Sequence, residues 1–381
     1  MGYEGRADIM ATWAQAFTWR VCQHFLDAPT RDGPIAIARR LCGMHAQVMS
    51  CAAMAIGIRG SGAAPADVRR ALEPERSLVK TWAMRGTLHL LPAEDLPLFT
   101  AALSTRTGAL IEAWARYGID MPTILATIPE ALDSRCLTRE ALAREVARIS
   151  GRPDLEKALM GSWGGTLKPA AYQGLLCFGP NEGRNVTFVS PRQWVGDWRE
   201  VDTEEACAAI VRRYLDAYGP ATHTDFAHWF GIPLRPARER FARMADELVA
   251  VDMEGLRAWM TPAGAEGLFV EGEADTVRLL PGFDPYTIGA LPHLDRLLPG
   301  SLRARISRTS GWISPVLLVD GRIAGVWKHE IRRGTARITI EPFAPLPARA
   351  RAATEKNAAT IGTLLGAPVE AIWEASPRSI L

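Results

Sequence analysis

Apolar positions in the first two thirds of the chain recur with a helical period, interrupted by short segments in which apolar and other side chains alternate. Residues 78–92 (LVKTWAMRGTLHLLP) alternate around Arg85-Gly86, which predicts a β-hairpin. Before this hairpin, residues 35–60 carry an apolar helical stripe, and residues 66–72 (ADVRRAL) predict a short helix. Helices followed by a hairpin form the outline of a winged helix, so we expect one here.

The same order of elements recurs in a second copy. Thr138 is a good N-cap for the apolar stripe ALAREVARI. Residues 155–162 and 165–178 predict two further helices, and residues 181–190 (NEGRNVTFVS) predict the turn and strand of a wing. We therefore expect a second winged helix.

The third copy has the clearest pattern. Residues 203–218 predict an amphipathic helix with Thr203 as its N-cap and glutamates in its first turn. Residues 221–231 (ATHTDFAHWFG) and 236–248 (PARERFARMADEL) predict the next two helices, and residues 249–260 (VAVDMEGLRAWM) predict a two-stranded wing. These elements complete a third winged helix.

From about residue 276 the period of the apolar positions changes to two, which is typical of strands. The segments TVRLLPGFDPY, SPVLLVDGRIAGVWKHE and TARITIEPF predict strands, with turns at Asp320-Gly321 and Gly334. Residues 347–363 predict one helix, and PVEAIWE predicts a last strand. The end of the chain is therefore expected to form a β-rich domain.

The predicted fold class is α+β, with three tandem winged-helix modules followed by a C-terminal β-rich, barrel-like domain with one helix. The length of 381 residues is sufficient for this number of modules. The expected boundaries are 1–125 for the N-terminal helix and first winged helix, 126–198 for the second, 199–265 for the third, and 266–381 for the C-terminal domain.

The composition is that of a globular protein without a membrane span. Hydrophobic residues make up 48% and charged residues 23% of the chain, and no apolar run approaches the ~18 residues that a spanning helix needs. The N-terminal segment carries acids and lacks the apolar stretch of a signal peptide. Six scattered cysteines without a CxxC pair indicate reduced thiols in a cytoplasmic protein.

The sequence contains no recognisable motif for a metal or a nucleotide cofactor. His223 and His228 are five residues apart, which does not place them on one helix face, and HExxH is absent. Gly-rich phosphate loops and the Gly-x-Ser-x-Gly elbow are also absent. We therefore expect no metal, no cofactor and no membrane association.

The net charge is only +2, but basic residues concentrate near the C-terminus. From Arg303 to Arg337 there are eight arginines and lysines against Asp320 and Glu330, a local charge of 8 − 2 = +6. Bases on hairpins are compatible with a phosphate-contacting surface and equally with a solvated sheet face. Charge alone leaves both interpretations open.

Two uncharged hydrogen-bonding side chains stand in the apolar stretch LCGMHAQVMS, residues 41–50. His45 and Gln47 point the same way if this stretch is extended and diverge if it is helical. One interpretation is a helix with a polar edge, in which His45 is a hydrogen-bonded core residue. The other is a site that handles a water molecule, because an amide oxygen can hold water and an imidazole titrates near neutrality.

Four stretches in a fixed order carry a resemblance to a known family. They are WAMRGTLHLLPAEDL (82–96), GPATHTDFAHWFG (219–231), LLPGFDPYTIG (279–289) and PVLLVDGRIAGVWK (315–328). With the order of modules they cover residues 30–375, and the chain resembles the winged-helix, AlkZ-type DNA glycosylases of bacteria. The resemblance implies a monofunctional DNA-repair glycosylase that removes bulky or crosslinking N7-alkylpurines from double-stranded DNA, and we expect a monomer associated with the nucleoid.

The catalytic pair of such enzymes lies in a Gln-x-Gln or Gln-x-Asp motif of the first winged helix, with an apolar residue between. In this sequence His45-Ala46-Gln47 holds that place, so the first glutamine is replaced by histidine. A His-x-Gln branch of the family is associated with self-resistance to DNA-alkylating natural products. The resemblance thus implies His45 and Gln47 as the catalytic residues.

The chemistry of N7-alkylguanine agrees with this residue set. The alkylated base is cationic and departs neutral, so the enzyme has to position a water and stabilise positive charge on the sugar. The motif contains no paired carboxylates, and no lysine is placed for a Schiff base, so a β-lyase step is not expected.

Two further residues are candidates for catalytic support. Asp284 in PGFDPY either faces the active channel and assists electrostatically or caps a turn before Pro285. His89 in RGTLHLL is either functional or a structural hydrogen-bonding residue.

The resemblance also implies contacts to DNA from the C-terminal region, because the family uses a hairpin there near the lesion. Trp312, at a loop or hairpin tip, either wedges against bases or covers the end of the β-rich domain. The residues expected to bind DNA are Arg303, Arg305, Arg308, Trp312, Lys328, His329, Arg332, Arg333, Trp163 and Lys168.

An alternative from another class is a non-catalytic winged-helix DNA-binding transcriptional regulator, since fold alone does not fix function. A regulator usually combines one winged helix with a dimerisation or ligand domain. Three modules in tandem with a β-rich tail favour the enzyme.

Overall fold

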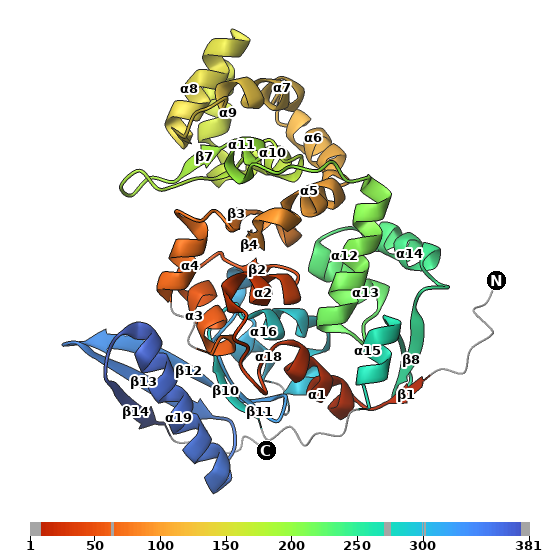
Figure 1. Cartoon of the computed structure of the whole chain (residues 1–381), viewed down its shortest axis with the longest axis vertical. Helices are drawn as coiled ribbons and strands as arrows, with labels where there is room; N and C mark the ends of the chain where they lie inside the picture. Colours follow the sequence, from red (N-terminus) through yellow and green to blue (C-terminus); the bar gives the residue numbers. More distant parts are fainter. Residues whose placement is uncertain (1–8, 62–64, 270–275, 299, 301, 375–381) are drawn as a thin grey trace.

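The structure, a computed structural model, describes residues 9–61, 65–269, 276–298, 300 and 302–374. Figure 1 shows small helical units with their own sheets, arranged along one long axis. The second unit, residues 121–195, lies at one end, and the C-terminal sheet with its long helix lies at the other. No helix within the described ranges is long and apolar enough to cross a membrane.

The first unit, residues 33–92, packs three helices against a sheet of strand order β2-β4-β3. The predicted hairpin is confirmed, because β3 and β4 pair antiparallel along their whole length. The helical stripe expected over 35–60 is broken: its first helix ends at Arg40, and Gly43 turns the chain into β2 with a φ of 102°, where a Cβ would lie 2.9 Å from Leu91. The elements are α2 (Gly33–Arg40), β2 (Met44–His45), α3 (Met49–Arg59), α4 (Pro65–Leu72), β3 (Leu78–Trp82) and β4 (Leu88–Pro92).

The second unit has a sheet of order β5-β7-β6 and is entered through α5 (Leu96–Ser104) and α6 (Thr107–Ala115). Thr138 caps a helix as predicted, since its hydroxyl accepts a backbone N–H of the first turn. The helix expected over 165–178 ends at Tyr172, where Gly174 with a φ of 67° leads toward a strand. The elements are α7 (Met121–Ala131), β5 (Leu137–Thr138), α8 (Arg139–Ser150), α9 (Asp154–Met160), α10 (Lys168–Tyr172), β6 (Cys177–Phe178), β7 (Thr187–Val189) and α11 (Pro191–Val195).

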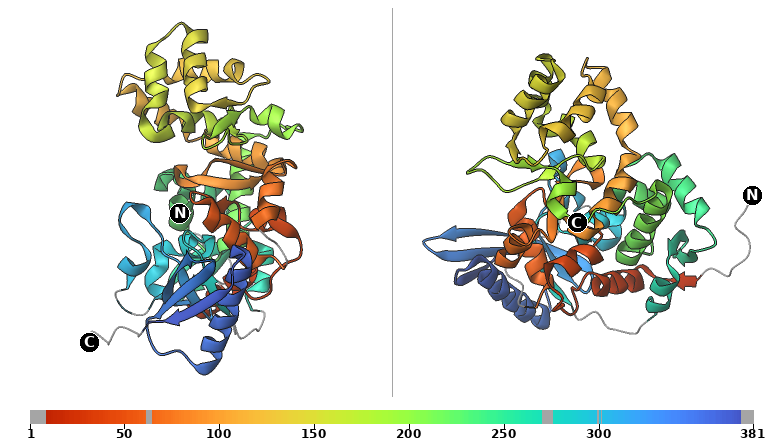
Figure 2. Two further views of the ribbon diagram at one scale, coloured as in Figure 1. Left: turned by 90° about the vertical axis from the view of Figure 1, so that its left-hand side faces the viewer. Right: turned by 45° about the horizontal axis from the view of Figure 1, so that its top comes forward.

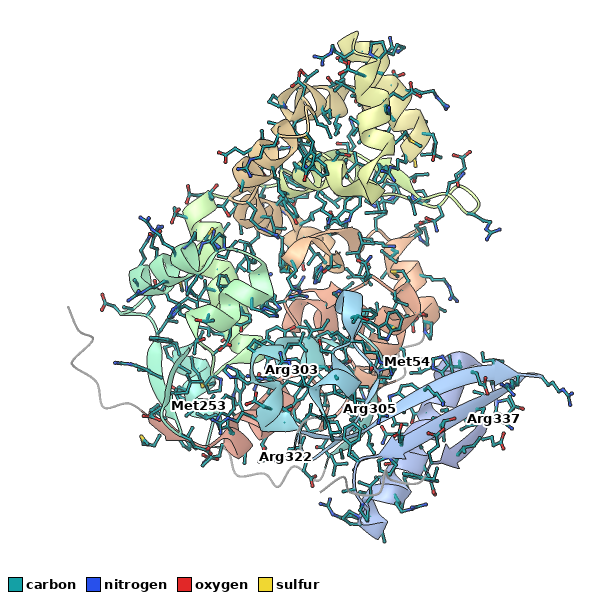
Figure 3. All side chains as sticks on the ribbon, turned by 180° about the vertical axis from the view of Figure 1, so that it is seen from behind. Met54, Met253, Arg303, Arg305, Arg322 and Arg337 are labelled. Atoms are coloured by element: carbon teal, nitrogen blue, oxygen red, sulfur yellow. The ribbon has the colours of Figure 1, made fainter. Side chains whose placement is uncertain are left out.

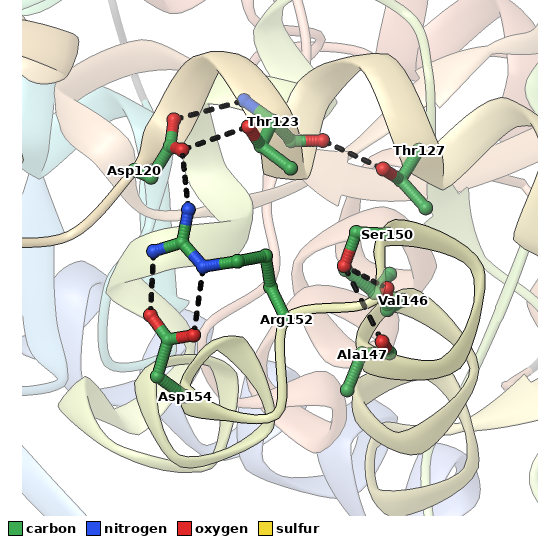
Figure 4. Close-up of polar contacts among 8 residues, drawn as sticks. All are labelled: Asp120, Thr123, Thr127, Val146, Ala147, Ser150, Arg152 and Asp154. Atoms are coloured by element: carbon green, nitrogen blue, oxygen red, sulfur yellow. Dashed lines mark hydrogen bonds and ion pairs between the residues drawn. The ribbon is translucent and has the colours of Figure 1, made fainter.

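Arg152 ties the connection between α8 and α9 to the start of α7 (Figure 4). Its guanidinium donates to Asp154 at 2.8 and 2.9 Å and to Asp120 at 3.2 Å. Asp120 in turn caps α7 by accepting the N–H of Thr123 at 3.1 Å. Because these side chains are partly exposed, the contact fixes local geometry and adds little to stability.

The third unit, residues 203–260, has a sheet of order β1-β8-β9, in which the N-terminal strand β1 runs parallel to β8. Its first helix has the predicted bounds, but the cap is Asp202 instead of Thr203, because this carboxylate accepts two N–H groups of the first turn at 2.9 and 3.0 Å. The helix expected over 236–248 begins two residues earlier and ends at Arg243. The elements are β1 (Ile9–Ala11), α12 (Thr203–Tyr218), α13 (His223–Phe230), α14 (Leu234–Arg243), β8 (Val249–Met253) and β9 (Leu256–Met260).

The C-terminal unit, residues 262–373, contains a sheet of order β10-β11-β12-β13-β14. Within the described residues β10 and β14 are its two edges, so the sheet is open and the expectation of a barrel-like closure is wrong. Short helices accompany the predicted long helix α19, so the expectation of one helix is also wrong. The elements are α15 (Pro262–Gly267), β10 (Val277–Leu280), α16 (Pro285–Gly289), α17 (Leu294–Leu297), α18 (Arg303–Ile306), β11 (Val316–Val319), β12 (Arg322–Arg332), β13 (Thr335–Pro342), α19 (Ala348–Leu365) and β14 (Val369–Trp373).

The turns of three predicted hairpins share one geometry. Glu254-Gly255, Asp320-Gly321 and Arg333-Gly334 each connect paired strands with two residues of positive φ. This backbone matches the twist of antiparallel strands, and glycine at the second position adopts it without a steric penalty. The local sequence therefore determines these turns.

The N-terminal segment joins the third and C-terminal units. Strand β1 extends the third sheet, and α1 (Trp13–Gln23) lies in one hydrophobic core with the C-terminal sheet. Phe17 of α1 lies close to Gly321, where a Cβ would be 3.0 Å from the Phe17 Cβ. One hydrophobic core thus contains residues of the first, second and third units, and another contains residues of α1, the third unit and the C-terminal unit.

A fully buried ion pair joins the first unit to the C-terminal unit. Arg59, the last residue of α3, donates through Nη1 and Nη2 to the two carboxylate oxygens of Asp284 at 2.7 Å each, and both side chains are 0% exposed. Arg59 also donates to the carbonyl of Ala55 at 3.0 Å, and Asp284 accepts the N–H of Tyr286 at 2.9 Å as the cap of α16. These bonds compensate the desolvation of both charges.

We expect Asp284→Asn to lower the free energy of unfolding by about 3–5 kcal/mol, because it leaves the Arg59 charge buried without its counterion. Urea denaturation measures the change. The matched control is Arg235→Ala, which removes the exposed pair between Arg235 and Glu239 and should cost at most about 1 kcal/mol. Equal small effects of both substitutions would contradict this account.

Candidate active site

His45 lies at the end of β2, on the face of the first unit's sheet that also carries His89 and Thr81. The three residues are cross-strand neighbours, and each is at most 6% exposed. The His45 ring meets the His89 ring edge-on at 5.3 Å and stacks on Phe283 at 5.3 Å with an interplanar angle of 13°. The motif is therefore extended at His45 and does not form a polar helix edge.

Gln47 lies just beyond β2 and is exposed. The N–H of Ala46 donates to the carbonyl of Leu88 at 2.7 Å, and the N–H of Leu88 donates to Oε1 of Gln47 at 3.3 Å. The amide oxygen of Gln47 keeps a second lone pair, and the amide nitrogen of Gln47 has no partner among the described residues. Gln47 can therefore receive a water or a DNA group beside the buried imidazole.

The His45 imidazole is neutral at physiological pH. Burial, and secondarily the positive charge of Arg85, lower the pKa of His45 to about 3, so the expectation of titration near neutrality is wrong. Its Nδ1 is buried without a hydrogen-bond partner. The site thus offers an imidazole that is a weak base, with one ring nitrogen buried and unpaired.

His89 is also held neutral. Burial, with the nearby His45 and Arg85, keeps the pKa of His89 well below its usual range. Its Nδ1 lies 3.1 Å from the carbonyl of Thr87, which favours the tautomer with a proton on Nδ1. His89 therefore contacts His45 in the structure, and a catalytic role of His89 stays a prediction.

The turn after β3 is a junction of three units. Arg85, in a left-handed conformation with a φ of 55°, donates to the carbonyl of Trp229 at 2.7 Å, and burial lowers its pKa to about 10. A Cβ at Gly231 would meet the Arg85 backbone at 2.8 Å, and one at Gly86 would meet Nζ of Lys168 at 3.3 Å. The sequence identifies Arg85 only as a turn residue, and in the fold its positive charge lies close enough to lower the pKa of His45.

Asp284 is a cap and a counterion, so of the two expected alternatives the structure supports the capping one. Its complete burial against Arg59 keeps it from facing an open channel. Arg59 is not among the predicted site residues. A single arginine in the apolar helix MSCAAMAIGIR is nevertheless a signal of a buried ion pair, because a buried arginine needs an acidic partner.

Phe283, next to Asp284, is a second residue that sequence reasoning missed. It has a φ of 60°, a conformation that costs a bulky residue on the order of 1 kcal/mol or more, and it is 9% exposed. Its ring contacts His45 on one side and meets Trp312 edge-on at 5.0 Å on the other. Trp312 is 47% exposed, so these aromatic rings lead from the motif to the surface.

Trp312 stands in a short loop closed by a bridge between Ser307 and Ile313. Of the expected DNA-binding arginines nearby, Arg308 is exposed, Arg303 donates to a backbone carbonyl, and Arg305 pairs with Glu341 at 2.5 Å. Figure 3 shows Arg303 and Arg305 near the centre of the molecule and Arg337 out on the C-terminal sheet.

The hairpin of β12 and β13 projects from the body of the molecule, as Figures 1 and 2 show. It carries four of the expected DNA-binding residues, all of them exposed: Lys328, His329, Arg332 and Arg333. Lys328 pairs with Glu374 and Arg332 with Glu330, while Arg333 occupies the turn and Ile331 is 56% exposed. The hairpin therefore presents basic and apolar groups together.

The two candidates in the second unit lie elsewhere. Lys168 is half-buried beside Gly86, and burial, with the nearby Arg106, lowers its pKa. The side chain of Trp163 lies outside the described residues. The structure therefore does not bring Lys168 together with the C-terminal basic residues.

A cavity of about 500 Å³ opens between the first and second units, on the sheet face opposite to His45 and His89. Met49, two residues after Gln47, forms part of its wall together with Leu78, Lys80 and Phe178. The Lys80 ammonium lies 5.2 Å from the Phe178 ring centre, and burial lowers the pKa of Lys80. The cavity thus combines apolar and charged walls, and neither His45 nor Gln47 lines it.

No group of three His, Cys, Asp or Glu side chains within the described ranges is arranged to hold a metal ion.

A family model described as DNA glycosylase AlkZ-like matches residues 38–364. An interstrand DNA cross-link repair glycosylase of Streptomyces sahachiroi is 36% identical over 369 residues, which are 94% of this chain and 98% of the relative. The solved structure of Streptomyces sahachiroi DNA glycosylase AlkZ has a TM-score of 0.85 and 35% identity, and the match covers 96% of this chain and 100% of that chain.

The protein is thus an enzyme of the DNA glycosylase class, which acts in DNA repair. More narrowly, the chain belongs to the AlkZ-like DNA glycosylase family. The predicted family and enzyme class are confirmed, and they replace the alternative of a non-catalytic regulator. The mixed α and β architecture is also that of the solved relative.

We expect the stabilising contribution of a neutral His45 to fall as the pH is lowered. The folded pKa of about 3 lies below the unfolded value near 6.5, so the unfolded chain binds a proton in this window and the folded chain does not. The contribution is complete above pH 6.5. Relative to His45→Asn, the wild type should lose about 2 kcal/mol of stability between pH 7 and pH 5.

Urea unfolding of both proteins across this range measures the difference. His223→Asn is a control, because His223 is partly exposed and lies in the third unit. A constant difference between wild type and His45→Asn at all pH values would show that His45 titrates normally.

Proposed function

We propose that the enzyme hydrolyses the N-glycosidic bond of guanine carrying a bulky N7-alkyl group, with His45 and Gln47 as the catalytic residues. The observation that carries the proposal is the placement of a buried, neutral imidazole at the end of β2 and an exposed amide two residues further along the chain of a DNA glycosylase. The products are the alkylated base and an abasic site in double-stranded DNA.

The proposed reaction begins with cleavage of the bond between C1′ and N9, whose electron pair neutralises the cationic base as it departs. Positive charge then develops on the sugar. Gln47 holds a water through the free lone pair of Oε1, the water adds to C1′, and its proton passes to solvent through His45. Because the base leaves without acid catalysis, a weakly basic imidazole is sufficient.

A neutral His45 also suits the charge of the transition state. An imidazolium at this place would repel the cationic base and the oxocarbenium-like sugar, whereas a neutral ring presents a dipole and a lone pair. Burial, which holds the imidazole neutral, thus supports hydrolysis of a cationic substrate.

The bulky substrate is supported by the comparison with a known enzyme. The relative of Streptomyces sahachiroi is named an interstrand DNA cross-link repair glycosylase, which fits a large adduct. The N7 atom of guanine lies in the major groove, so a bulky substituent need not enter a tight base pocket.

We assign the three helix-and-hairpin units to winged-helix modules within 1–125, 126–198 and 199–265, followed by a C-terminal domain over 266–381. Support comes from the three-stranded sheet in each of the first three units. Duplex DNA would contact the β12–β13 hairpin through Arg332 and Arg333, with Trp312 nearer the reacting nucleotide.

We expect His45→Ala and Gln47→Ala each to reduce the single-turnover rate by about 100-fold while DNA binding persists. Duplex DNA with a single N7-alkylguanine, either simple or bulky, is incubated with enzyme and treated with alkali, and strand cleavage reports the abasic site. Gln173→Ala, an exposed glutamine of the second unit, is the matched control. Wild-type inactivity on every adduct, or full activity of both variants, would refute the proposal.

We expect the double variant Arg332→Ala/Arg333→Ala to weaken DNA binding uniformly across sequences and to lower the slope of log K against log salt by about 2. Binding titrations from low to moderate salt measure the slope. Arg351→Ala/Lys356→Ala, on the exposed side of α19, is the matched control. An unchanged slope in Arg332→Ala/Arg333→Ala would show that the hairpin tip does not contact DNA.

A further inference from the structure

Phe283 is the link between the candidate catalytic imidazole and the surface of the C-terminal unit. Its ring lies parallel to the His45 ring at 5.3 Å and edge-on to Trp312 at 5.0 Å. The His45 ring also meets the His89 ring edge-on at 5.3 Å. The imidazole therefore contacts both an aromatic ring from the C-terminal unit and a histidine from its own sheet.

The backbone of Phe283 is held in an unfavourable conformation by its neighbours. Its φ is 60°, in the left-handed region that bulky residues rarely adopt. On one side Gly282 packs so closely that a Cβ would lie 3.0 Å from the carbonyl of Ile313, and on the other Asp284 is fixed by Arg59. Strain that is imposed from both sides at a functional site points to a role for the residue.

We propose that Phe283 is a positioning residue of the reaction, which acts through His45 by stacking on the imidazole, fixing its orientation and excluding water from its face. The inference rests on the proposed catalytic role of His45. The ion pair of Arg59 and Asp284 holds Phe283 in place, so the first and C-terminal units must be docked for the site to be complete.

The stacking has a consequence for charge. The charged or titratable groups that face His45 are His89 from β4 and Arg85 from the turn after β3, while Asp284 is neutralised by Arg59. Burial is the larger cause of the lowered pKa of His45, and the Phe283 ring is part of that burial. Removing the ring should admit water and raise the pKa toward its ordinary value near 6.5.

The test compares wild type with Phe283→Ala, Phe283→Leu and Phe283→Tyr. Single-turnover rates on a duplex with one N7-alkylguanine are measured from pH 5 to pH 8, together with the half-saturating enzyme concentration. NMR of the imidazole carbons measures the pKa of His45 in the free proteins. Urea unfolding shows whether each variant is folded, and Phe283→Leu carries the test if the alanine variant is not.

We expect Phe283→Ala and Phe283→Leu to slow the reaction by about 10- to 100-fold with little change in half-saturation. Their rates should fall below an inflection near pH 6, whereas the wild-type rate stays flat. Phe283→Tyr keeps the ring and should remain within about 3-fold of wild type with a flat profile.

A wild-type rate and flat profile in the alanine or leucine variant would overturn the inference. A slower reaction with an unchanged His45 titration would also overturn it, because the residue would then act only on the fold. Failure of the wild type to cleave any adduct would instead refute the proposed function, and the NMR titration would still decide whether Phe283 controls the His45 imidazole.

Discussion

The site depends on the buried ion pair of Arg59 and Asp284. Neither charge is stable in an apolar environment alone, so the first unit and the C-terminal unit gain this contact only when both are docked. The bidentate geometry fixes direction as well as distance, because Nη1 donates to one carboxylate oxygen and Nη2 to the other, each at 2.7 Å. It therefore sets the place of Phe283, the residue before Asp284, over the His45 ring of the first unit.

Docking of the third unit fixes the other side of the site. Arg85 reaches the carbonyl of Trp229, and Gly231 allows the close approach of the two backbones. The charge of Arg85 then adds to burial in disfavouring a protonated His45. The state of one imidazole thus depends on contacts from three units, although the residues of the motif are adjacent in sequence.

The predictions from sequence succeeded where local chemistry decides. Turns such as Asp320-Gly321 and Glu254-Gly255 follow from the need for positive φ, and Thr138 follows from the unpaired N–H groups at a helix start. They failed where distant partners decide: the closure of the C-terminal sheet depends on which edge strands pair, and no periodicity reveals that.

The site shows the same division. His45 and Gln47 stand out in the sequence, and the resemblance implies their catalytic role, whereas Arg59 and Asp284, which are 225 residues apart, are joined only by the fold. The stacking of Phe283 on His45 was equally invisible, because the sequence around Phe283 signals only a capped turn before Pro285. Long-range contacts of this kind determine which candidate residues meet.

The contacts of His45 also suit a position at which the family resemblance implies a glutamine. An amide is uncharged at every pH, and an imidazole in water carries a proton for part of the time near neutrality. Burial under Phe283 and beside Arg85 lowers the pKa of His45 to about 3, so the ring is as neutral as the amide that it replaces. The exchange therefore keeps the position uncharged, which suits the cationic substrate of the proposed function, and it adds a ring nitrogen with a lone pair.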